Sequence, residues 1–145
     1  MGLFDRVLGR EPQQKKPTDD VLLFHAMILM CAADGAIEDS EKATVAAFFT
    51  TLPEFRGKEF EKMLAASNRL FQKYGNARES VKALSEITSP AVRRKCFVLA
   101  ADIAMSSGDI DDNEEQLLEA MQRVLNVDEP TAQKVIEVLA MKYMQ

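Results

Sequence analysis

The chain alternates between segments that are apolar on all sides of a helix and segments with a single apolar stripe. Residues 21–33 ("VLLFHAMILMCAA") and 95–105 ("KCFVLAADIAM") carry apolar side chains in almost every direction around a helical axis. A helix of that kind is buried on all sides, so we predict that both lie in the middle of a helical bundle. No run alternates with a period of two, as a half-exposed strand would.

Amphipathic helices are predicted around this central pair. Apolar residues recur at three- and four-residue steps over residues 39–51 and 55–74. They do so again from the acidic stretch at residues 107–115 to Leu125, and from Asp128 to the end. A short helix is predicted from Asn76 through Ile87. The pattern therefore indicates an all-α fold.

Capping residues set the predicted ends of these helices. Thr18 is a candidate N-cap, and Gly75 suits a left-handed helix end. Asn76 followed three residues later by Glu79 is a capping-box pattern, and Ser89 before Pro90 is typical of a helix start.

Length and composition favour a single soluble domain. At 145 residues, 47% hydrophobic and 28% charged, the chain can build one substantial core. We expect an N-terminal amphipathic segment and linker over residues 1–17 and one helical domain over 18–145. Because there is neither a bilayer-length apolar run nor a signal peptide pattern, we expect a cytoplasmic protein.

Residues 1–10 ("MGLFDRVLGR") resemble a short amphipathic helix on a flexible tether. Two roles remain open for this segment. It folds back onto the body of the protein, or it contacts a partner or the membrane surface peripherally.

The net charge of −5 is concentrated in two short stretches, residues 34–41 and 107–115. Nothing resembles a broad basic face, so nucleic acid is not an expected partner. The stretches "DGAIEDSE" (34–41) and "SGDIDDNE" (107–114) align at an offset of 73, and the flanking apolar positions keep that register. We interpret this as an internal duplication, with repeat units over about 18–75 and 90–145 around a pseudo-two-fold axis.

Each acidic turn can be interpreted as a purely structural corner between two helices, without a ligand. Gly35 and Gly108 are expected to end the preceding helix, and Ile37 and Ile110 to close the two corners against the core. Glu41 and Glu114 stand where a capping-box glutamate would start the next helix.

Each turn nevertheless carries more carboxylates than a cap requires, and such clusters suit a hard divalent cation. Ca²⁺ or Mg²⁺ fits better than Zn²⁺, because His25 is the sole histidine and Cys31 and Cys96 lie in apolar segments. His25 is expected in or near the core, with one local hydrogen bond. The sequence contains no catalytic triad pattern and no phosphate-binding loop, so we do not expect an enzyme.

The two turns, "AADGAIEDSE" and "SSGDIDDNEEQLLEAMQRVLNVDE", together with the opening "MGLFDRVLG", resemble the TerB-like proteins of the tellurite-resistance group. The resemblance implies a compact bundle of about seven helices and a non-enzymatic stress-response role. It also implies a protein partner or a membrane-associated complex. Acidic residues suspected of binding metal in that family map here onto Asp34, Glu38, Glu41, Asp109, Asp111 and Glu114. The chain departs from the pattern at Ser107, which stands where a second copy of Asp34 is expected.

Three hypotheses follow for the function. The first is a binding module whose acidic turns engage a divalent cation or a basic protein partner. The second is a structural or scaffolding interaction protein whose acidic turns are helix caps only. The third, a hydrolase that uses the carboxylates, is the least favoured, because the turns show no pocket that would desolvate one of them.

Overall fold

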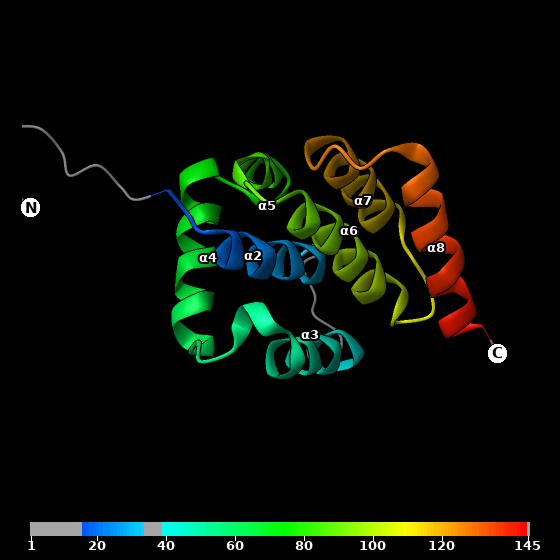
Figure 1. Cartoon of the computed structure of the whole chain (residues 1–145), viewed down its shortest axis with the longest axis horizontal. Coiled ribbons are helices and arrows are strands. Elements are labelled where there is room, and N and C mark those ends of the chain that lie inside the picture. Colours follow the sequence, from blue (N-terminus) through cyan, green and yellow to red (C-terminus); the bar gives the residue numbers. More distant parts are fainter. Residues whose placement is uncertain (1–15, 34–38, 145) are drawn as a thin grey trace, which may run out of the picture.

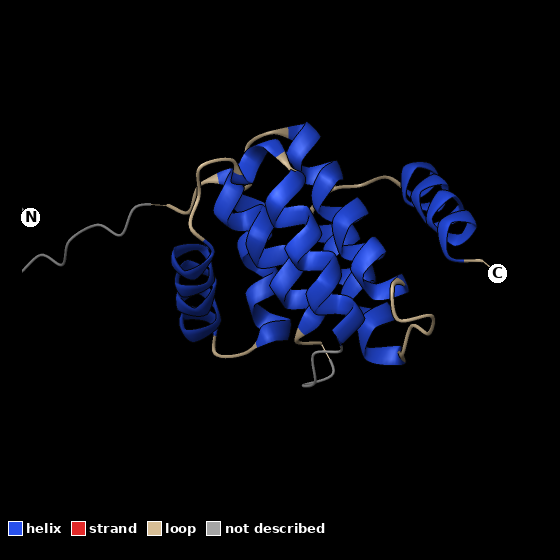
Figure 2. Cartoon of the chain, turned by 90° about the horizontal axis from the view of Figure 1, so that it is seen from below, coloured by secondary structure: helices blue, strands red, loops and turns tan. Residues whose placement is uncertain are grey.

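The computed structural model describes residues 16–33 and 39–144, and this part of the chain contains seven α-helices and two short 3₁₀ segments (Figure 1). The helices are α2 (Asp19–Cys31), α3 (Asp39–Thr51), α4 (Phe60–Tyr74), α5 (Ala77–Ser80), α6 (Pro90–Met105), α7 (Asp112–Val124) and α8 (Glu129–Tyr143). The 3₁₀ segments are Pro53–Phe55 and Val81–Glu86. Among the described residues there is no strand (Figure 2), and the all-α prediction is confirmed.

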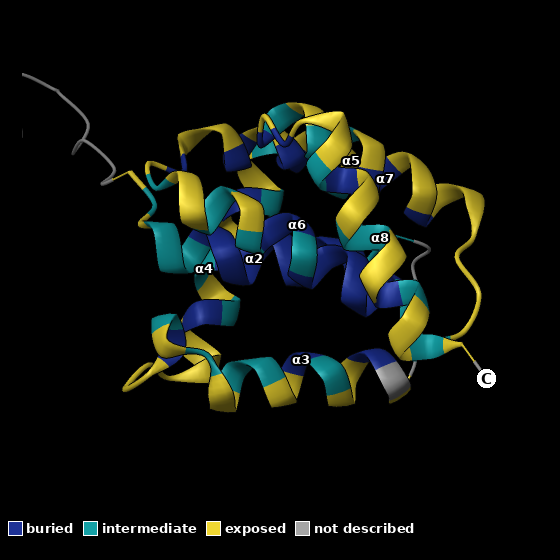
Figure 3. Cartoon of the chain, turned by 45° about the vertical axis from the view of Figure 1, so that its right-hand side comes forward, coloured by how far each residue is buried: buried dark blue, intermediate teal, exposed yellow. Residues whose placement is uncertain are grey.

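Helices α2 and α6 form the centre of the bundle, as their all-round apolar sequences predicted (Figure 3). Nine of the thirteen residues of α2 are buried. On α6, Ala100, Ala101 and Ala104 have no exposed surface, and small side chains of this kind allow two helix axes to approach closely. These alanines lie on one of the two helices that the sequence placed in the middle of the bundle.

The remaining helices surround this pair. Helix α4 packs on α2, α8 packs on α6, and α3 contacts both central helices. Helix α7 lies against α6 and the 3₁₀ segment Val81–Glu86. Helices α3 and α7 each have thirteen residues and begin 73 positions apart, which is the offset of the two acidic stretches. The duplication and its pseudo-two-fold axis stay a prediction.

Most predicted caps are present. Gly75 ends α4 in the left-handed conformation, with φ of +92°. The side chain of Asn76 accepts a hydrogen bond from the Glu79 backbone at 2.8 Å, and Ser89 caps α6 by accepting one from Val92 at 3.3 Å. These short-range patterns placed the end of α4 and the starts of α5 and α6.

Thr18 is the N-cap residue of α2 as predicted, although its side chain makes no capping hydrogen bond. One predicted helix start was wrong. The helix expected from residue 55 begins at Phe60, because Pro53–Phe55 forms a 3₁₀ turn and Gly57 follows with φ of +75°. The ring of Phe55 instead stacks on Phe49, with ring centroids 5.4 Å apart.

Some expectations lie outside the described residues. They are the amphipathic N-terminal segment over residues 1–10 and the first acidic turn over residues 34–38. Within the described ranges, none of the helices has the length and apolar character needed to cross a membrane.

Candidate functional site: the acidic turns

The second acidic turn is built by its backbone. Helix α6 ends at Met105, and Gly108 follows with φ of +89°, a conformation that favours glycine. The Gly108 amide donates to the Met105 carbonyl at 3.1 Å, and the Ser107 hydroxyl donates to the Asp109 carbonyl at 2.9 Å. Ser107 therefore supports the turn through its hydroxyl at the position where the first turn carries Asp34.

Asp111 and Glu114 form the capping box that the sequence predicted for this turn. The Asp111 carboxylate accepts a hydrogen bond from the Glu114 amide at 2.8 Å, and the Glu114 carboxylate accepts one from the Asp111 amide at 3.4 Å. Glu114 is buried, with 5% of its surface exposed. The structure thus brings these two candidate ligands together, and their geometry is that of a helix start.

Three further carboxylates of this turn stay at the surface: Asp109, Asp112 and Glu115 are all exposed. None of the three forms an ion pair with a lysine or arginine in the described ranges. The positive end of α7 favours Asp112 and Glu115. Their charge is otherwise exposed to solvent.

Of the first acidic turn, residues 34–41, the structure describes only the part from residue 39 on. Asp34 and Glu38 lie outside the described residues. Glu41, in the first turn of α3, is buried, with 3% of its surface exposed, whereas Asp39 is exposed and lies 3.9 Å from Lys42. Across residues 16–33 and 39–144, no three Asp, Glu, His or Cys side chains gather as a metal site would require. The metal assignment of the six acidic residues stays a prediction.

Ile110 does not close the corner against the core, so that prediction was wrong. Its side chain is 39% exposed, and it lines a groove between α7 and α8. The capping box already fixes the start of α7, which frees the preceding residue to face outward.

His25 is a core residue and not a surface ligand. It is fully buried, and its Nδ1 lies 2.7 Å from the Oγ of buried Ser67 on α4. The bond joins residues 42 positions apart, so the expectation of a local bond was wrong. Burial lowers the pKa of His25 to about 4, although the Ser80 backbone acts in the opposite direction.

The cysteines are also poor candidates for zinc ligands. Cys31 and Cys96 are both buried, and neither is in a disulfide. Burial raises the pKa of the Cys96 thiol far above its ordinary value, which disfavours the thiolate that a metal requires.

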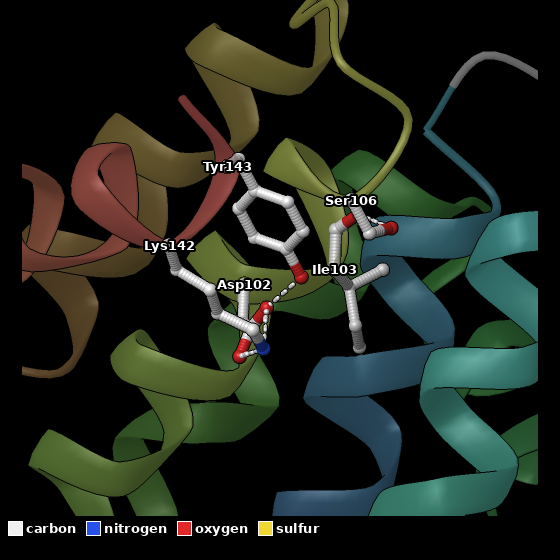
Figure 4. A network of polar contacts seen from close by, with 5 residues as sticks. All are labelled: Asp102, Ile103, Ser106, Lys142 and Tyr143. Atoms are coloured by element: carbon white, nitrogen blue, oxygen red, sulfur yellow. Dashed lines mark hydrogen bonds and ion pairs between the residues drawn. The ribbon is translucent and has the colours of Figure 1, made fainter. Parts of the chain in front are cut away.

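Sequence analysis missed a polar network centred on Asp102, which is buried in α6 (Figure 4). Asp102 accepts hydrogen bonds from Lys142 and Tyr143 at the end of α8. A carboxylate inside the otherwise apolar segment 95–105 was the available signal, because a buried carboxylate requires a partner. The network fastens α8 to the centre of the bundle.

Comparison with known families supports this description. A model of the family described as "Tellurite resistance protein TerB" matches residues 21–136, well over half of the chain. No curated protein and no solved structure matches the chain with significant similarity. The matched range runs from the start of α2 into α8 and includes both acidic turns. The chain belongs to the TerB family of tellurite resistance proteins.

Proposed function

We propose that this protein is a non-enzymatic binding module of a stress or tellurite response. Its acidic turns would engage positive charge from outside the molecule. That charge comes from a divalent cation, Ca²⁺ or Mg²⁺ rather than Zn²⁺, or from a basic protein partner.

One observation carries the proposal: the second turn uses Asp111 and Glu114 as a cap and still exposes three carboxylates without a described ion pair. Like charges on one turn repel one another, and a bound cation relieves that repulsion. Oxygen ligands of this kind suit Ca²⁺ and Mg²⁺, with water completing the coordination shell. Asp109, Asp112 and Glu115 are therefore the residues we expect to matter most at this turn.

A binding role is favoured over a catalytic one because the histidine, the usual general base, is buried. His25 is buried against Ser67 and has a pKa of about 4, so it does not present a base to solvent. A general base works best with a pKa near the operating pH and within reach of substrate. Asp109, Asp112 and Glu115 of the second turn, by contrast, face solvent.

The proposal is tested by titrating the full chain with CaCl₂, MgCl₂, MnCl₂ and ZnCl₂ while recording heat and melting temperature. A cation that binds only the folded state raises the melting temperature as its concentration increases. We expect a rise with Ca²⁺ or Mg²⁺ that Asp109→Asn together with Asp112→Asn abolishes. The matched control, Glu61→Gln on the exposed surface of α4, should leave the rise unchanged.

A basic partner has a separate readout. A lysine-rich peptide should bind the same turn, with an affinity that falls as salt is added. If neither the cations nor this peptide produce heat or stabilisation, the binding role of the second turn is rejected.

A second candidate is a scaffolding protein whose acidic turns serve only as caps, and the capping box of Asp111 and Glu114 favours it. Glu114→Gln separates the two candidates, because glutamine also fits the third position of a capping box. If capping is the whole role, this variant retains its stability and no cation response exists to be lost. If the turn binds cations, Glu114→Gln retains the fold and weakens the response.

A further inference from the structure

A groove of about 600 Å³ runs between α7 and α8, with Phe97 of α6 on its floor. Leu118 and Ile136 continue the apolar floor from the two sides, and the exposed Ile110 lies at its edge. Apolar surface of this kind between two helices suits the apolar face of a third helix.

The rim of the groove is acidic on both sides. Glu115 and Glu119 lie one turn apart on α7, and Glu129 and Glu137 lie on α8. All four are exposed, and no lysine or arginine lines the groove. Glu129 and Glu137 accept hydrogen bonds only from glutamines, Gln122 and Gln133, as far as the described residues go. The occupant that fits is a short amphipathic helix with basic residues beside its apolar stripe.

The chain itself contains a segment with this chemistry. Residues 3, 4, 7 and 8 are Leu, Phe, Val and Leu, at the spacing of one helical face. Arg6 and Arg10 are four residues apart and so share one edge of such a helix. The segment thus combines an apolar stripe with a basic edge, whereas the groove combines an apolar floor with an acidic rim.

The length of the connection allows this segment to reach the groove in the same molecule. Asp19, at the start of α2, accepts a hydrogen bond from the Ser89 amide at 3.1 Å, so the starts of α2 and α6 are adjacent. Phe97 lies eight residues beyond Ser89, about 12 Å along the helix. Residues 11–15, which join this segment to the first described residue, Lys16, span up to about 17 Å when extended.

We propose that residues 2–10 dock as an amphipathic helix in the groove between α7 and α8 of the same chain. Leu3, Phe4, Val7 and Leu8 cover the apolar floor, and Arg6 and Arg10 face the glutamate rim. The docked segment then covers Ile110.

A tryptophan placed in the segment tests this, because the chain contains no tryptophan of its own. In the full-length variant Phe4→Trp, we expect a blue-shifted emission that is protected from acrylamide and independent of protein concentration. Adding Glu119→Lys and Glu137→Lys should move the emission to that of a water-exposed indole. Helix content, followed by circular dichroism, should stay unchanged.

Two further variants identify the groove as the cause. Glu61→Lys with Gln72→Lys places a similar change of charge on the exposed surface of α4 and should leave the emission blue-shifted. Arg6→Glu with Arg10→Glu, combined with Glu119→Lys and Glu137→Lys, should restore the blue shift, because glutamates on the segment then face lysines on the rim.

Several results would overturn the proposal. The first is an emission typical of exposed indole in Phe4→Trp itself. The second is a blue shift that persists after Glu119→Lys and Glu137→Lys are added. The third is an equal loss of the blue shift in the α4 control, Glu61→Lys with Gln72→Lys. A blue shift that grows with protein concentration would show that a second copy supplies the segment. A blue shift that appears only when anionic phospholipid vesicles are added would assign the segment to a membrane surface.

Discussion

Lys142 and Asp102 join the last turn of α8 to the buried centre of α6. The Lys142 Nζ lies 3.0 and 2.9 Å from the two carboxylate oxygens of Asp102, which is only 6% exposed. Lys142 itself reaches solvent, with 52% of its side chain exposed. The two partners therefore differ in what their removal leaves behind.

Removing Lys142 should cost more than removing both partners. Lys142→Met leaves the buried Asp102 carboxylate without its cation, and we expect a loss of about 1–3 kcal/mol in the free energy of unfolding. The double variant Asp102→Asn with Lys142→Met should recover part of that loss. Urea denaturation measures both values, and a double variant less stable than the single one would contradict this account.

The same network predicts a loss of stability at alkaline pH. The hydrogen bond to Asp102 raises the pKa of Lys142, although partial burial opposes this. Burial and the neighbouring Asp102 raise the pKa of Tyr143. Both groups therefore hold protons more tightly in the folded state, so stability is full below about pH 10 and falls as pH rises through the folded pKa values. Denaturation midpoints measured from pH 8 to 11 should fall less steeply in Asp102→Asn.

The buried His25 predicts a loss of stability as pH falls into the acid range. Its folded pKa of about 4 lies below the ordinary value of 6.5, so the unfolded chain takes up a proton first as pH falls. Stability should be full above about pH 6.5 and decline by about 3 kcal/mol toward pH 4. In His25→Asn that contribution disappears, and the difference between the two pH profiles isolates it from the carboxylates. Parallel profiles for the two proteins would show that His25 does not titrate as described.

The parts of the fold that sequence predicted depend on short-range patterns. Helix α3 has the predicted bounds Asp39–Thr51, and Ser89 and Pro90 open α6 as expected. Caps and apolar stripes act within one or two turns, so the local sequence contains the whole signal. The Asp111 and Glu114 cap was predictable for the same reason.

Contacts between distant parts of the chain were not predictable in this way. Asp19, in the first turn of α2, accepts hydrogen bonds from Thr88 and Ser89, about 70 residues away. Ile110 was placed in the core because the pattern could not show that α8 leaves a groove beside it. Such pairings depend on how the helices pack, which a single sequence does not display.

Arg93 joins the start of α6 to the residues just before it and to the end of α7. Its guanidinium donates to the carbonyls of Ser85, Ile87 and Val124, at 2.6, 2.9 and 3.3 Å. Lysine cannot donate in three fixed directions, so Arg93→Lys should lose about 1–3 kcal/mol of stability. The neighbouring Arg94→Lys is the matched control, because Arg94 is exposed, and it should change stability by less than about 0.5 kcal/mol. Equal losses in the two variants would mean that the three carbonyl contacts contribute little.

Asp111 allows capping and ligand binding to be separated at a single residue. Asp111→Ala removes the acceptor for the Glu114 amide and should cost about 1 kcal/mol. Asp111→Ser retains a good N-cap but removes the charge, so its stability without added cation should stay close to that of the wild type. If Asp111 also contributes to cation binding, Asp111→Ser loses part of the rise in melting temperature with Ca²⁺ or Mg²⁺. A full rise in Asp111→Ser would restrict Asp111 to capping and leave Asp109, Asp112 and Glu115 as the groups that hold the cation.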